Sequence, residues 1–374
     1  MRNAIQYYFC IFFMMILNSS TAFSQDIAPS AKVTAGYKKG FYIHSEDSLF
    51  KLNINGMIKT RFDLFSDESI VQNAAGDSSA DRTLHSSFDV PFARIQLSGN
   101  LFSKKLKYNF YYNLPDNKMI YAWIGWDFIP EKFVIKAGMF KRPFGRAFLT
   151  SSVKKEFIDA PLGQMGTGRD IGVELSNQFD KVKGLEWAVG VFNGENGTGG
   201  YFSPVLAGRI GFNNGIAGYS ETDFEGGPFR YGIGLSASTE FDHDNNNTTT
   251  HNISADATLK IHGFNTSAGF YLQSNAQEYI GDKMNLANIG GHIQAGYLIN
   301  NLIEPVARYG FLHSPHVRGD LKQQMTAGLT IHIFPGHHFK WENNVTLQKT
   351  PLQNDIPAAD LWDMLFTSQL QCYF

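Results

Sequence analysis

Apolar and polar side chains alternate over long stretches of this chain. Between Lys51 and Leu64, every second position is apolar or small, and the positions between them are mostly polar or charged. A period of two is that of a β-strand with one apolar face. The same alternation occurs on both sides of the polar segment 103–105, so the two flanking stretches predict a β-hairpin.

This alternation predicts sixteen strands along the chain. They are expected at residues 51–64, 93–100, 107–114, 119–128, 133–140, 170–178, 184–193, 204–212, 229–241, 251–262, 264–273, 288–299, 303–312, 322–334, 338–348 and 362–374. Bacterial outer-membrane barrels have even strand numbers, and about sixteen strands enclose an aqueous lumen. The pattern therefore predicts an all-β fold, a transmembrane antiparallel β-barrel of about 16 strands.

The connections between the predicted strands differ in length. Short ones at 103–105, 130–132 and 335–337 are expected to be periplasmic turns. Long polar ones, expected to be outer loops, lie at 66–90, 194–203, 213–227, 242–250 and 349–361. About 28 residues between Phe140 and Gly168 show no sustained strand pattern, and so long a connection in a compact barrel is usually functional. We expect this third loop to fold into the lumen.

The N-terminal residues have the pattern of an export signal. Arg2 precedes an apolar run at residues 7–17, and small residues around Ser24 provide a cleavage point. The run is shorter than the roughly 18 to 20 residues of a spanning helix. We therefore expect a cleaved signal peptide at 1–24, a periplasmic lead-in at 25–48 and the barrel at 49–374.

Composition excludes several other classes of protein. Lys and Arg number 32 against 34 Asp and Glu, so the basic surface of a nucleic-acid-binding protein is not expected. Cys10 lies in the predicted signal peptide, which leaves Cys372 without a partner for a disulfide in the mature chain. The histidines at 313, 316, 337 and 338 lack carboxylates or cysteines at ligand spacing, so neither a metal nor a cofactor is expected.

Several segments, taken in order, resemble the phosphate-selective porin O/P family. They are Gly40-Phe41-Tyr42-Ile43, Gly56-Met57-Ile58-Lys59-Thr60-Arg61-Phe62, Gly138-Met139-Phe140-Lys141-Arg142-Pro143-Phe144, Gly190-Val191-Phe192-Asn193-Gly194, Ala207-Gly208-Arg209, Gln294-Ala295-Gly296-Tyr297, Glu304-Pro305-Val306-Ala307-Arg308-Tyr309 and Thr326-Ala327-Gly328-Leu329. The resemblance implies a homotrimeric sixteen-stranded channel for anions in the outer membrane of a Gram-negative bacterium. Phosphate or polyphosphate is the preferred cargo of some members of that family.

The last strand also resembles a known signal. The alternation continues to the final residue, Phe374, as in the terminal segment that the barrel-assembly machinery reads in outer-membrane barrels. This resemblance implies that the assembly machinery is a partner of the chain. Outer-membrane lipid and lipopolysaccharide are the further partners that a barrel at this location implies.

The phase of the alternation predicts which charged side chains face the lumen. Twelve bases share the polar phase: Lys51, Lys59, Arg61, Arg94, Lys107, Lys136, Arg209, Arg230, Lys260, Arg308, Lys322 and Lys340. Nine acids share it as well: Asp63, Asp127, Glu174, Glu186, Glu240, Asp256, Glu304, Glu342 and Asp363. An excess of bases along a pore attracts anions and repels cations, so weak anion selectivity is predicted.

The third loop has the same bias. Its bases are Lys141, Arg142, Arg146, Lys154 and Lys155, against only Glu156 and Asp159. Arginine forks hold phosphate or carboxylate oxygens in pairs, whereas lysine acts as a point charge. We therefore predict that these five bases form the constriction and bind anions. The alternative is a solvated loop, or one that docks on lipopolysaccharide phosphates.

These observations favour a water-filled, weakly anion-selective diffusion channel over a high-affinity phosphate channel, because the twelve bases are spread over many strands and offset by nine acids. Two other functions stay open. A non-conducting barrel could act as a surface receptor or adhesion protein. An outer-membrane hydrolase would need an activated nucleophile, and the chain contains no Gly-x-Ser-x-Gly elbow. We therefore expect no enzymatic activity.

Overall fold

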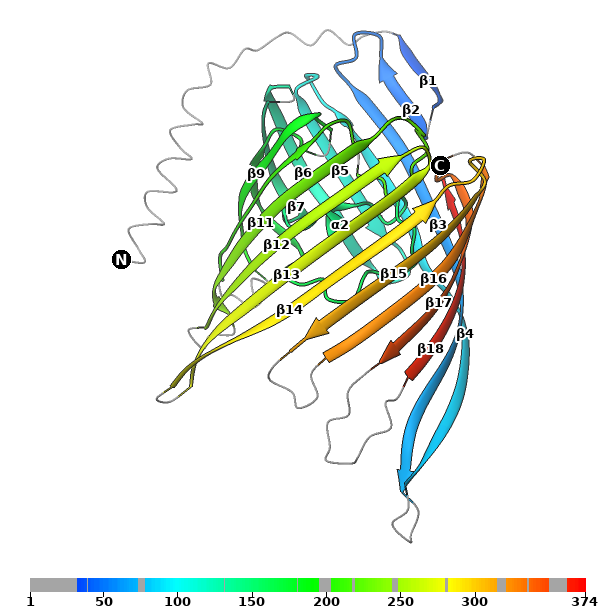
Figure 1. Cartoon of the computed structure of the whole chain (residues 1–374). Coiled ribbons are helices and arrows are strands. Elements are labelled where there is room, and N and C mark those ends of the chain that lie inside the picture. Colours follow the sequence, from blue (N-terminus) through cyan, green and yellow to red (C-terminus); the bar gives the residue numbers. More distant parts are fainter. Residues whose placement is uncertain are drawn as a thin grey trace.

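A computed structural model shows one closed antiparallel barrel (Figure 1). It describes residues 32–38, 40–72, 78–130, 132–179, 181–194, 203–216, 219–243, 248–279, 282–314, 321–334, 336–349 and 362–374. The barrel strands are β3 (Lys51–Gln72), β4 (Ser78–Asn100), β5 (Leu106–Asn113), β6 (Lys118–Ile129), β7 (Phe133–Lys141), β8 (Arg169–Ser176), β9 (Gly184–Phe192), β10 (Val205–Asn213), β11 (Arg230–His243), β12 (Thr248–Ile261), β13 (Phe264–Tyr279), β14 (Asp282–Tyr297), β15 (Ile303–His313), β16 (Leu321–Phe334), β17 (Phe339–Lys349) and β18 (Trp362–Tyr373).

Each barrel strand pairs with its neighbours in the chain, and β18 closes the barrel on β3. In that closing pair, Met364 lies opposite Ser66 and Tyr373 lies opposite Met57. The predicted fold of 16 antiparallel strands is therefore confirmed. No helix among the described residues is long and apolar enough to cross a membrane.

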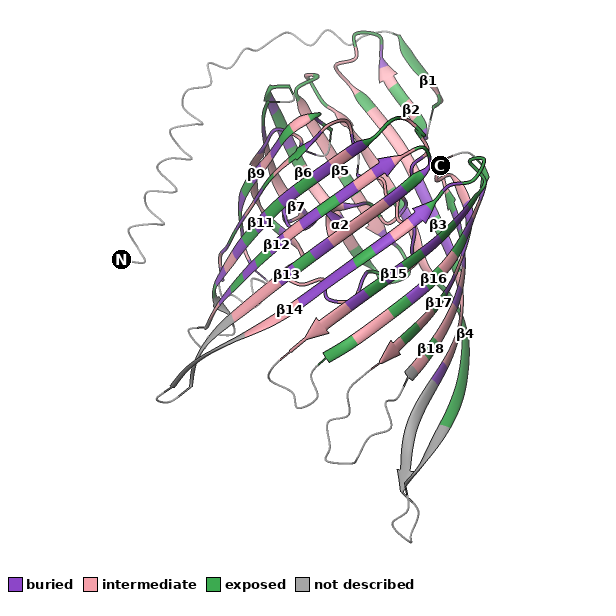
Figure 2. Ribbon diagram, viewed as in Figure 1, coloured by how far each residue is buried: buried purple, intermediate pink, exposed green. Residues whose placement is uncertain are grey.

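Side chains alternate between the lumen and the outside, as the sequence pattern predicted. In β15, Ile303, Ala307 and Tyr309 are exposed on the outer surface, whereas Glu304 and Arg308 are buried inside. Figure 2 shows this alternation as changes of colour along single strands. An apolar outer surface around a polar interior is the arrangement of barrels that lie in lipid.

Two predicted outer loops differ from the structure. The segment 66–90 is mostly strand, because β3 and β4 continue as a long hairpin past the ends of their neighbours (Figure 1). The connection predicted at 213–227 links β10 to β11 at the opposite end of the barrel, beside the short turns and Phe374. The prediction of an outer loop was wrong because it rested on the length of the connection. The strict up-and-down order of the strands decides at which end of the barrel a connection lies.

The remaining predicted outer loops cannot be compared in the same way. The segments 194–203 and 349–361 lie largely outside the described residues, and 242–250 lies partly outside them, with its described ends belonging to β11 and β12. The predicted signal peptide at 1–24 lies wholly outside them, and its cleavage stays a prediction.

A short hairpin extends the wall where the C-terminus ends. It consists of β1 (Val33–Tyr37) and β2 (Phe41–Ser45), which the sequence pattern had assigned only to a periplasmic lead-in at 25–48. β2 pairs with β3 from Ile54 to Lys51, just beyond the last residue paired with β18. The hairpin therefore occupies the edge of β3 that β18 leaves open.

The last residue is held against β3. Phe374 exchanges two backbone hydrogen bonds with Gly56, and its ring lies edge-on to Phe41. A Cβ atom at Gly56 would lie 2.3 Å from the Phe374 ring, so a larger residue at this position would displace the ring. The role of Phe374 as an assembly signal stays a prediction.

Candidate functional site

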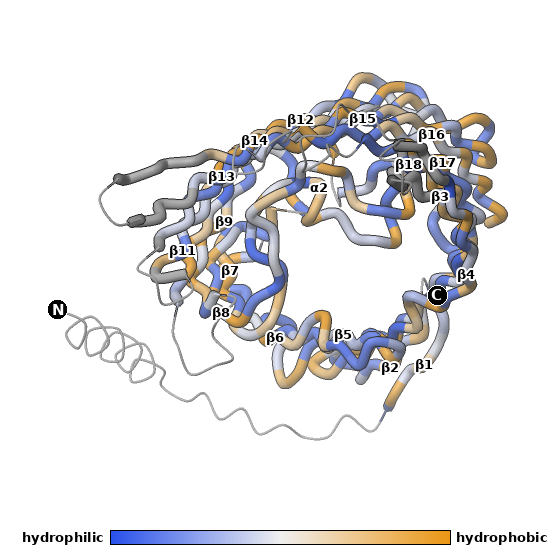
Figure 3. The backbone as a smooth tube through the Cα atoms, turned by 90° about the horizontal axis from the view of Figure 1, so that it is seen from below, coloured by the Kyte–Doolittle hydropathy of each residue, from blue (hydrophilic) through white to orange (hydrophobic). Residues whose placement is uncertain are grey.

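The third loop, residues 142–168 between β7 and β8, lies inside the barrel. It contains one turn of helix, α2 (Arg146–Leu149). Figure 3 looks along the barrel and shows α2 within the ring of strands, nearer to β12 and β15 than to β4 and β5. The inward fold of this loop, predicted from its length, is confirmed.

Lumen-facing bases hold the loop by its backbone. Lys59 Nζ donates to the Ser152 carbonyl over 3.1 Å. Arg308 Nη1 donates to the Asp159 carbonyl over 2.9 Å. A loop without strand partners leaves its carbonyls unpaired, and burying such a group without a hydrogen bond is costly. These bases therefore stabilise the position of the loop.

Three further bases complete this attachment. Arg61 forms an ion pair of 2.8 Å with the Asp159 carboxylate, and Arg94 Nη1 lies 3.3 Å from the Ser152 hydroxyl. Lys340, wholly buried, donates to the Lys155 carbonyl over 2.6 Å and pairs with Glu342 at 2.7 Å. We call the side of the lumen that carries Lys59, Arg61, Arg94, Arg308 and Lys340 the docked sector.

Glycines allow the loop to approach the wall. Gly163 has a φ of +85°, and its carbonyl oxygen would lie 2.2 Å from a Cβ atom at Gly290 in β14. Any larger residue at Gly290 would push the loop away. The two backbones are therefore in direct contact at this point.

Two predicted constriction arginines face protein carboxylates. Arg146 lies 3.4 Å from both Glu186 and Asp256, and Arg142 lies 3.7 Å from Glu240. Arg146 and Arg142 are only 6% and 4% exposed. Within this structure their positive charge is therefore compensated by the barrel wall, and their predicted binding of anions stays a prediction.

The segment 219–229, which we call the lumenal insert, enters the barrel from the opposite end and meets the third loop. The backbone of Glu221 donates to the Lys154 carbonyl over 3.0 Å, and its carboxylate accepts from the backbone of Glu156 over 2.9 Å. Tyr219 stacks on Arg146, with the guanidinium carbon 4.0 Å from the ring centre. Sequence reasoning missed this insert because it assigned the segment to the outside.

The bases predicted at 209 and 230 serve the lumenal insert. Arg209 pairs with Asp256 at 2.6 Å and donates to the Tyr219 hydroxyl, and Arg230 pairs with Asp223 at 2.5 Å. The pKa of Tyr219 is raised above its ordinary value by burial. The insert is thus tied to the wall by ion pairs and by a neutral phenol.

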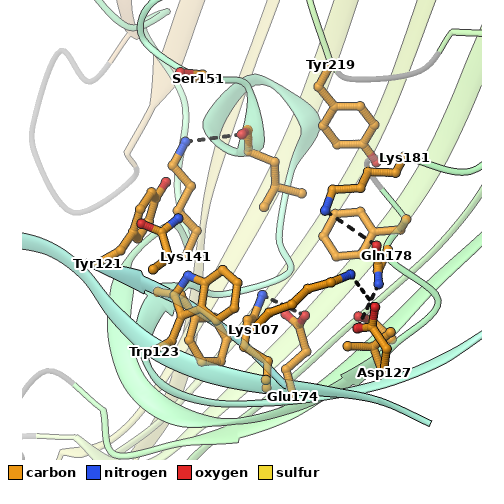
Figure 4. A pocket seen from close by; sticks show the side chains of 18 of the residues that line it. Lys107, Tyr121, Trp123, Asp127, Lys141, Ser151, Glu174, Gln178, Lys181 and Tyr219 are labelled. Atoms are coloured by element: carbon orange, nitrogen blue, oxygen red, sulfur yellow. Dashed lines mark hydrogen bonds and ion pairs between the residues drawn. The ribbon is translucent and has the colours of Figure 1, made fainter. Parts of the chain in front are cut away.

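A cavity of about 280 Å³ remains between the third loop and the wall formed by β5 to β8 (Figure 4). Its charged lining comprises five lysines and two carboxylates: Lys107, Lys136, Lys141, Lys154, Lys181, Asp127 and Glu174. We call this side of the lumen the open sector. The lining carries an excess of three positive charges, which raises the local concentration of anions.

The lysines of the open sector differ in their partners. Lys107 pairs with Asp127, and Lys136 pairs with Glu174 at 2.9 Å. Lys141 Nζ donates to three carbonyls of the third loop, at residues 148 to 150, over 2.5–3.2 Å. Lys181 lies 3.4 Å from the Gln178 side chain and is exposed (Figure 4). Lys141 thus has all three N–H groups engaged by the loop, whereas the ammonium groups of Lys107, Lys136 and Lys181 at the wall of the cavity remain within reach of a passing anion.

The structure thus separates the predicted site residues into groups. Lys107, Lys136, Lys141 and Lys154 line the cavity. Lys155 lies in the part of the third loop that Lys340 of the docked sector contacts, and burial lowers the pKa of its ammonium below the ordinary value. Lys181 was missed because it lies in the short connection between β8 and β9 and not in an alternating window.

Comparison with protein families gives one match over most of the barrel. A family model described as "Phosphate-selective porin O and P" matches residues 69–300. A protein of Aquifex aeolicus (strain VF5), described as uncharacterized, is 28% identical over 269 residues. That match covers 62% of this chain and 63% of the Aquifex protein, so the chain spans slightly less than two thirds of this relative.

Several solved structures are similar in fold. The anion-selective porin from Comamonas acidovorans has a TM-score of 0.60 at 13% identity, covering 86% of this chain and 99% of that one. The outer-membrane channel DcaP of Acinetobacter baumannii has a TM-score of 0.58 at 14% identity, covering 91% and 100%. The trimer form of OmpT of Vibrio cholerae has a TM-score of 0.54 at 10% identity, covering 86% and 99%.

Proposed function

Because the chain belongs to the phosphate-selective porin O and P family, we propose that it is a diffusion channel for small anions whose preference is set by the lysines of the open sector. The family and the barrel fold together indicate an outer-membrane protein and support a channel rather than an enzyme. The choice of anions, and the residues that make it, are our proposal.

One observation carries this proposal: the cavity beside the third loop is lined by five lysines and two carboxylates. Each lysine contributes a positive potential of about 1 kcal/mol to an anion 4 Å away in water, and more where water is partly excluded. An excess of three such charges therefore favours anions over cations. The favourable energy stays small enough for the anion to leave, as conduction requires.

The arginines argue for a general anion channel and against tight binding of phosphate. High-affinity phosphate sites use guanidinium forks that bind two oxygens at once. Here Arg146 faces Glu186 and Asp256, and Arg308 donates to backbone carbonyls. Phosphate is therefore proposed as one cargo among other small anions.

The remaining expectations complete the proposal. We propose export with a signal peptide at 1–24, a periplasmic lead-in at 25–48 and insertion by the barrel-assembly machinery through Phe374. A homotrimer is proposed from the family, and the Vibrio cholerae protein has a trimeric form. Lipid and lipopolysaccharide would surround such a trimer.

The test is the reversal potential of single channels in planar bilayers under a KCl gradient. The refolded protein is expected to conduct with an anion-biased reversal potential. The double variant Lys154→Gln/Lys181→Gln is expected to lose most of this bias, because it removes two of the excess charges. Lys104→Gln/Lys132→Gln, which removes two exposed lysines outside the cavity, is the matched control.

Two results would overturn the proposal. A correctly folded barrel without conductance would be a receptor or adhesion protein instead of a channel. A conducting barrel that prefers cations, or whose bias is equally reduced by both double variants, would show that the open sector does not set selectivity.

A further inference from the structure

A row of aromatic side chains begins beside Arg94 of the docked sector and continues into the open sector, and small inorganic anions do not need it. We propose that this row, formed by Tyr111, Tyr121 and Trp123, binds anions that carry an aromatic ring, with aromatic carboxylates as the chemical class. The inference rests on the proposed function, because it assumes that anions enter the cavity. It adds a class of cargo to the charge selection argued above.

The three rings occupy successive lumen-facing positions on neighbouring strands. Tyr121 and Trp123 are two residues apart on β6, and Tyr121 lies directly opposite Tyr111 on β5. The Tyr111 and Tyr121 rings are 5.7 Å apart, tilted by 34°. Positions two apart on one strand are separated by about 7 Å along the strand. The rings therefore form a continuous track along the wall.

Cations lie beside every ring of the track. The guanidinium carbon of Arg94 is 5.6 Å from the Tyr111 ring centre, and that of Arg169 is 5.9 Å from the Tyr121 ring centre. Lys136 Nζ is 5.8 Å from the Trp123 ring centre. An anion with a flat apolar body can stack on a ring while its charged group meets the adjacent cation.

The track differs from the aromatic side chains that only fill space. Phe140, Phe144 and Phe157 are at most 2% exposed and pack inside the loop and the wall. Tyr121 and Trp123 are only partly buried: they pack against the cluster around Phe140 and also line the cavity. Figure 4 shows both side chains on the β6 side of this space, next to Lys141 and Lys107.

The physical chemistry favours a cargo with a ring over inorganic phosphate. A strongly hydrated anion gains nothing from an apolar ring face, whereas an aromatic carboxylate removes that face and its own ring from water. The cavity of about 280 Å³ equals the volume of about nine liquid waters, which accommodates a one-ring anion. Apolar walls with a few convergent charges are typical of sites for small organic ligands.

The experiment measures interruption of the chloride current through single channels by added benzoate and by cyclohexanecarboxylate. These probes have the same charge and nearly the same size, and only benzoate is aromatic. We expect benzoate to interrupt the current at a concentration about two- to tenfold lower, the factor given by one aromatic contact. Inorganic phosphate is expected to be weaker than benzoate.

Variants assign the effect to the track. Trp123→Leu and Tyr121→Leu are expected to bring the two probe concentrations close together. The ratio is internal to each variant, so a change in its chloride conductance does not enter the comparison. Trp126→Leu is the matched control, because Trp126 lies on the same strand, faces outward and is 37% exposed. It is expected to keep the wild-type ratio.

The outcomes separate this inference from the proposed function. Anion-biased conductance with equal interruption by both probes overturns the aromatic track and leaves the anion channel standing. An unchanged ratio in both track variants also overturns the track. Absence of anion bias in the wild-type channel overturns the proposed function and, with it, this inference.

Discussion

The two sides of the lumen use the same residue types for different purposes. In the docked sector, Lys340 and Arg308 donate to carbonyls of the third loop and are at most 6% exposed. In the open sector, Lys107 and Lys136 pair with single carboxylates at the wall of the cavity of about 280 Å³. A lumen-facing base is therefore a structural part on one side and a candidate anion contact on the other.

This difference follows from where the third loop lies. A loop that enters a barrel must satisfy its own carbonyls, and the nearest donors are the charged side chains of the wall. The side that receives the loop loses its bases to this task. On the opposite side only Lys141 donates to the loop, and Lys107, Lys136 and Lys181 stay at the cavity, so the position of the loop decides which charges can act on a permeating ion.

The largest expected effect is a loss of stability in the docked sector. Lys340→Met removes the partner of the buried Glu342 carboxylate and the donor to the Lys155 carbonyl. Breaking one partner of a buried pair costs about 3–5 kcal/mol. The free energy of unfolding, measured by urea denaturation in detergent micelles, is expected to fall by this amount.

The matched control for that change is Lys181→Met in the open sector, which removes an exposed lysine and is expected to leave the unfolding midpoint nearly unchanged. The double variant Lys340→Met/Glu342→Gln is expected to recover part of the lost stability, because no buried charge is left without a partner. Equal destabilisation by Lys340→Met and Lys181→Met would show that the two sectors do not differ in this way.

The second effect concerns charge. Glu174→Gln leaves the cavity with one more uncompensated lysine, Lys136. We expect the anion permeability relative to potassium to rise, by at most about fivefold, since one charge is worth about 1 kcal/mol at 4 Å in water. The comparison is Glu304→Gln, which also removes one negative charge but at a wholly buried residue on the docked side. If it shifts the reversal potential as much, the cavity has no special influence on selectivity.

The sequence predicted the barrel well because the alternation is a property of single strands. Arg308 and Glu304 lie on the polar phase of one window, and their inward orientation follows from that phase. Their partners do not follow from it, since Arg308 contacts residue 159, far away in the chain. The phase gives the face of a side chain, whereas the long-range contact gives its role.

The lumenal insert and the docking of the third loop could not be predicted for the same reason. Gly163 of the third loop and Gly290 of β14 are in contact although they are far apart in the chain, and neither glycine has a distinctive local pattern. The end of the barrel at which the 219–229 segment lies follows only from the number of strands that precede it in the chain. Because this segment was predicted to lie outside the barrel, the contact of Glu221 with Glu156, which joins the lumenal insert to the third loop, was not predicted.

A pH dependence of the loop position is the third prediction. The pKa of Glu156 is raised well above its ordinary value by burial, with Glu304 and Glu221 nearby and Lys260 opposing the shift. The docked loop therefore holds a proton that the released loop loses first as the pH rises. Its stability is complete below the ordinary pKa of a glutamic acid and decreases above it, by at most about 1.4 kcal/mol per pH unit.

Measurement of the unfolding midpoint from about pH 5 to 8 tests this dependence. Glu156→Gln mimics the protonated carboxyl, so it is expected to raise stability at neutral pH and to flatten the profile. Glu225→Gln, at a largely exposed carboxylate of the lumenal insert, is the control and is expected to keep the wild-type slope. A wild-type midpoint that rises with pH over this range would contradict the prediction.

The smallest expected effect is at the rim of the docked sector, where the bases that hold the loop are partly exposed to water, as they are in the open sector. Arg61 contacts Asp63 and Asp159, and the Asp159 side chain is 48% exposed. Water screens such a pair, so Arg61→Lys, which keeps the charge and loses the fork, is expected to cost less than about 1 kcal/mol. Urea denaturation measures this loss, and Lys51→Arg at the exposed start of the same strand is the control. A loss as large as that of Lys340→Met would mean that an exposed contact stabilises the loop as much as a buried one. A small loss accompanied by noisier single-channel current would indicate that the loop moves more at its exposed contact with Arg61 than at its buried contact with Lys340.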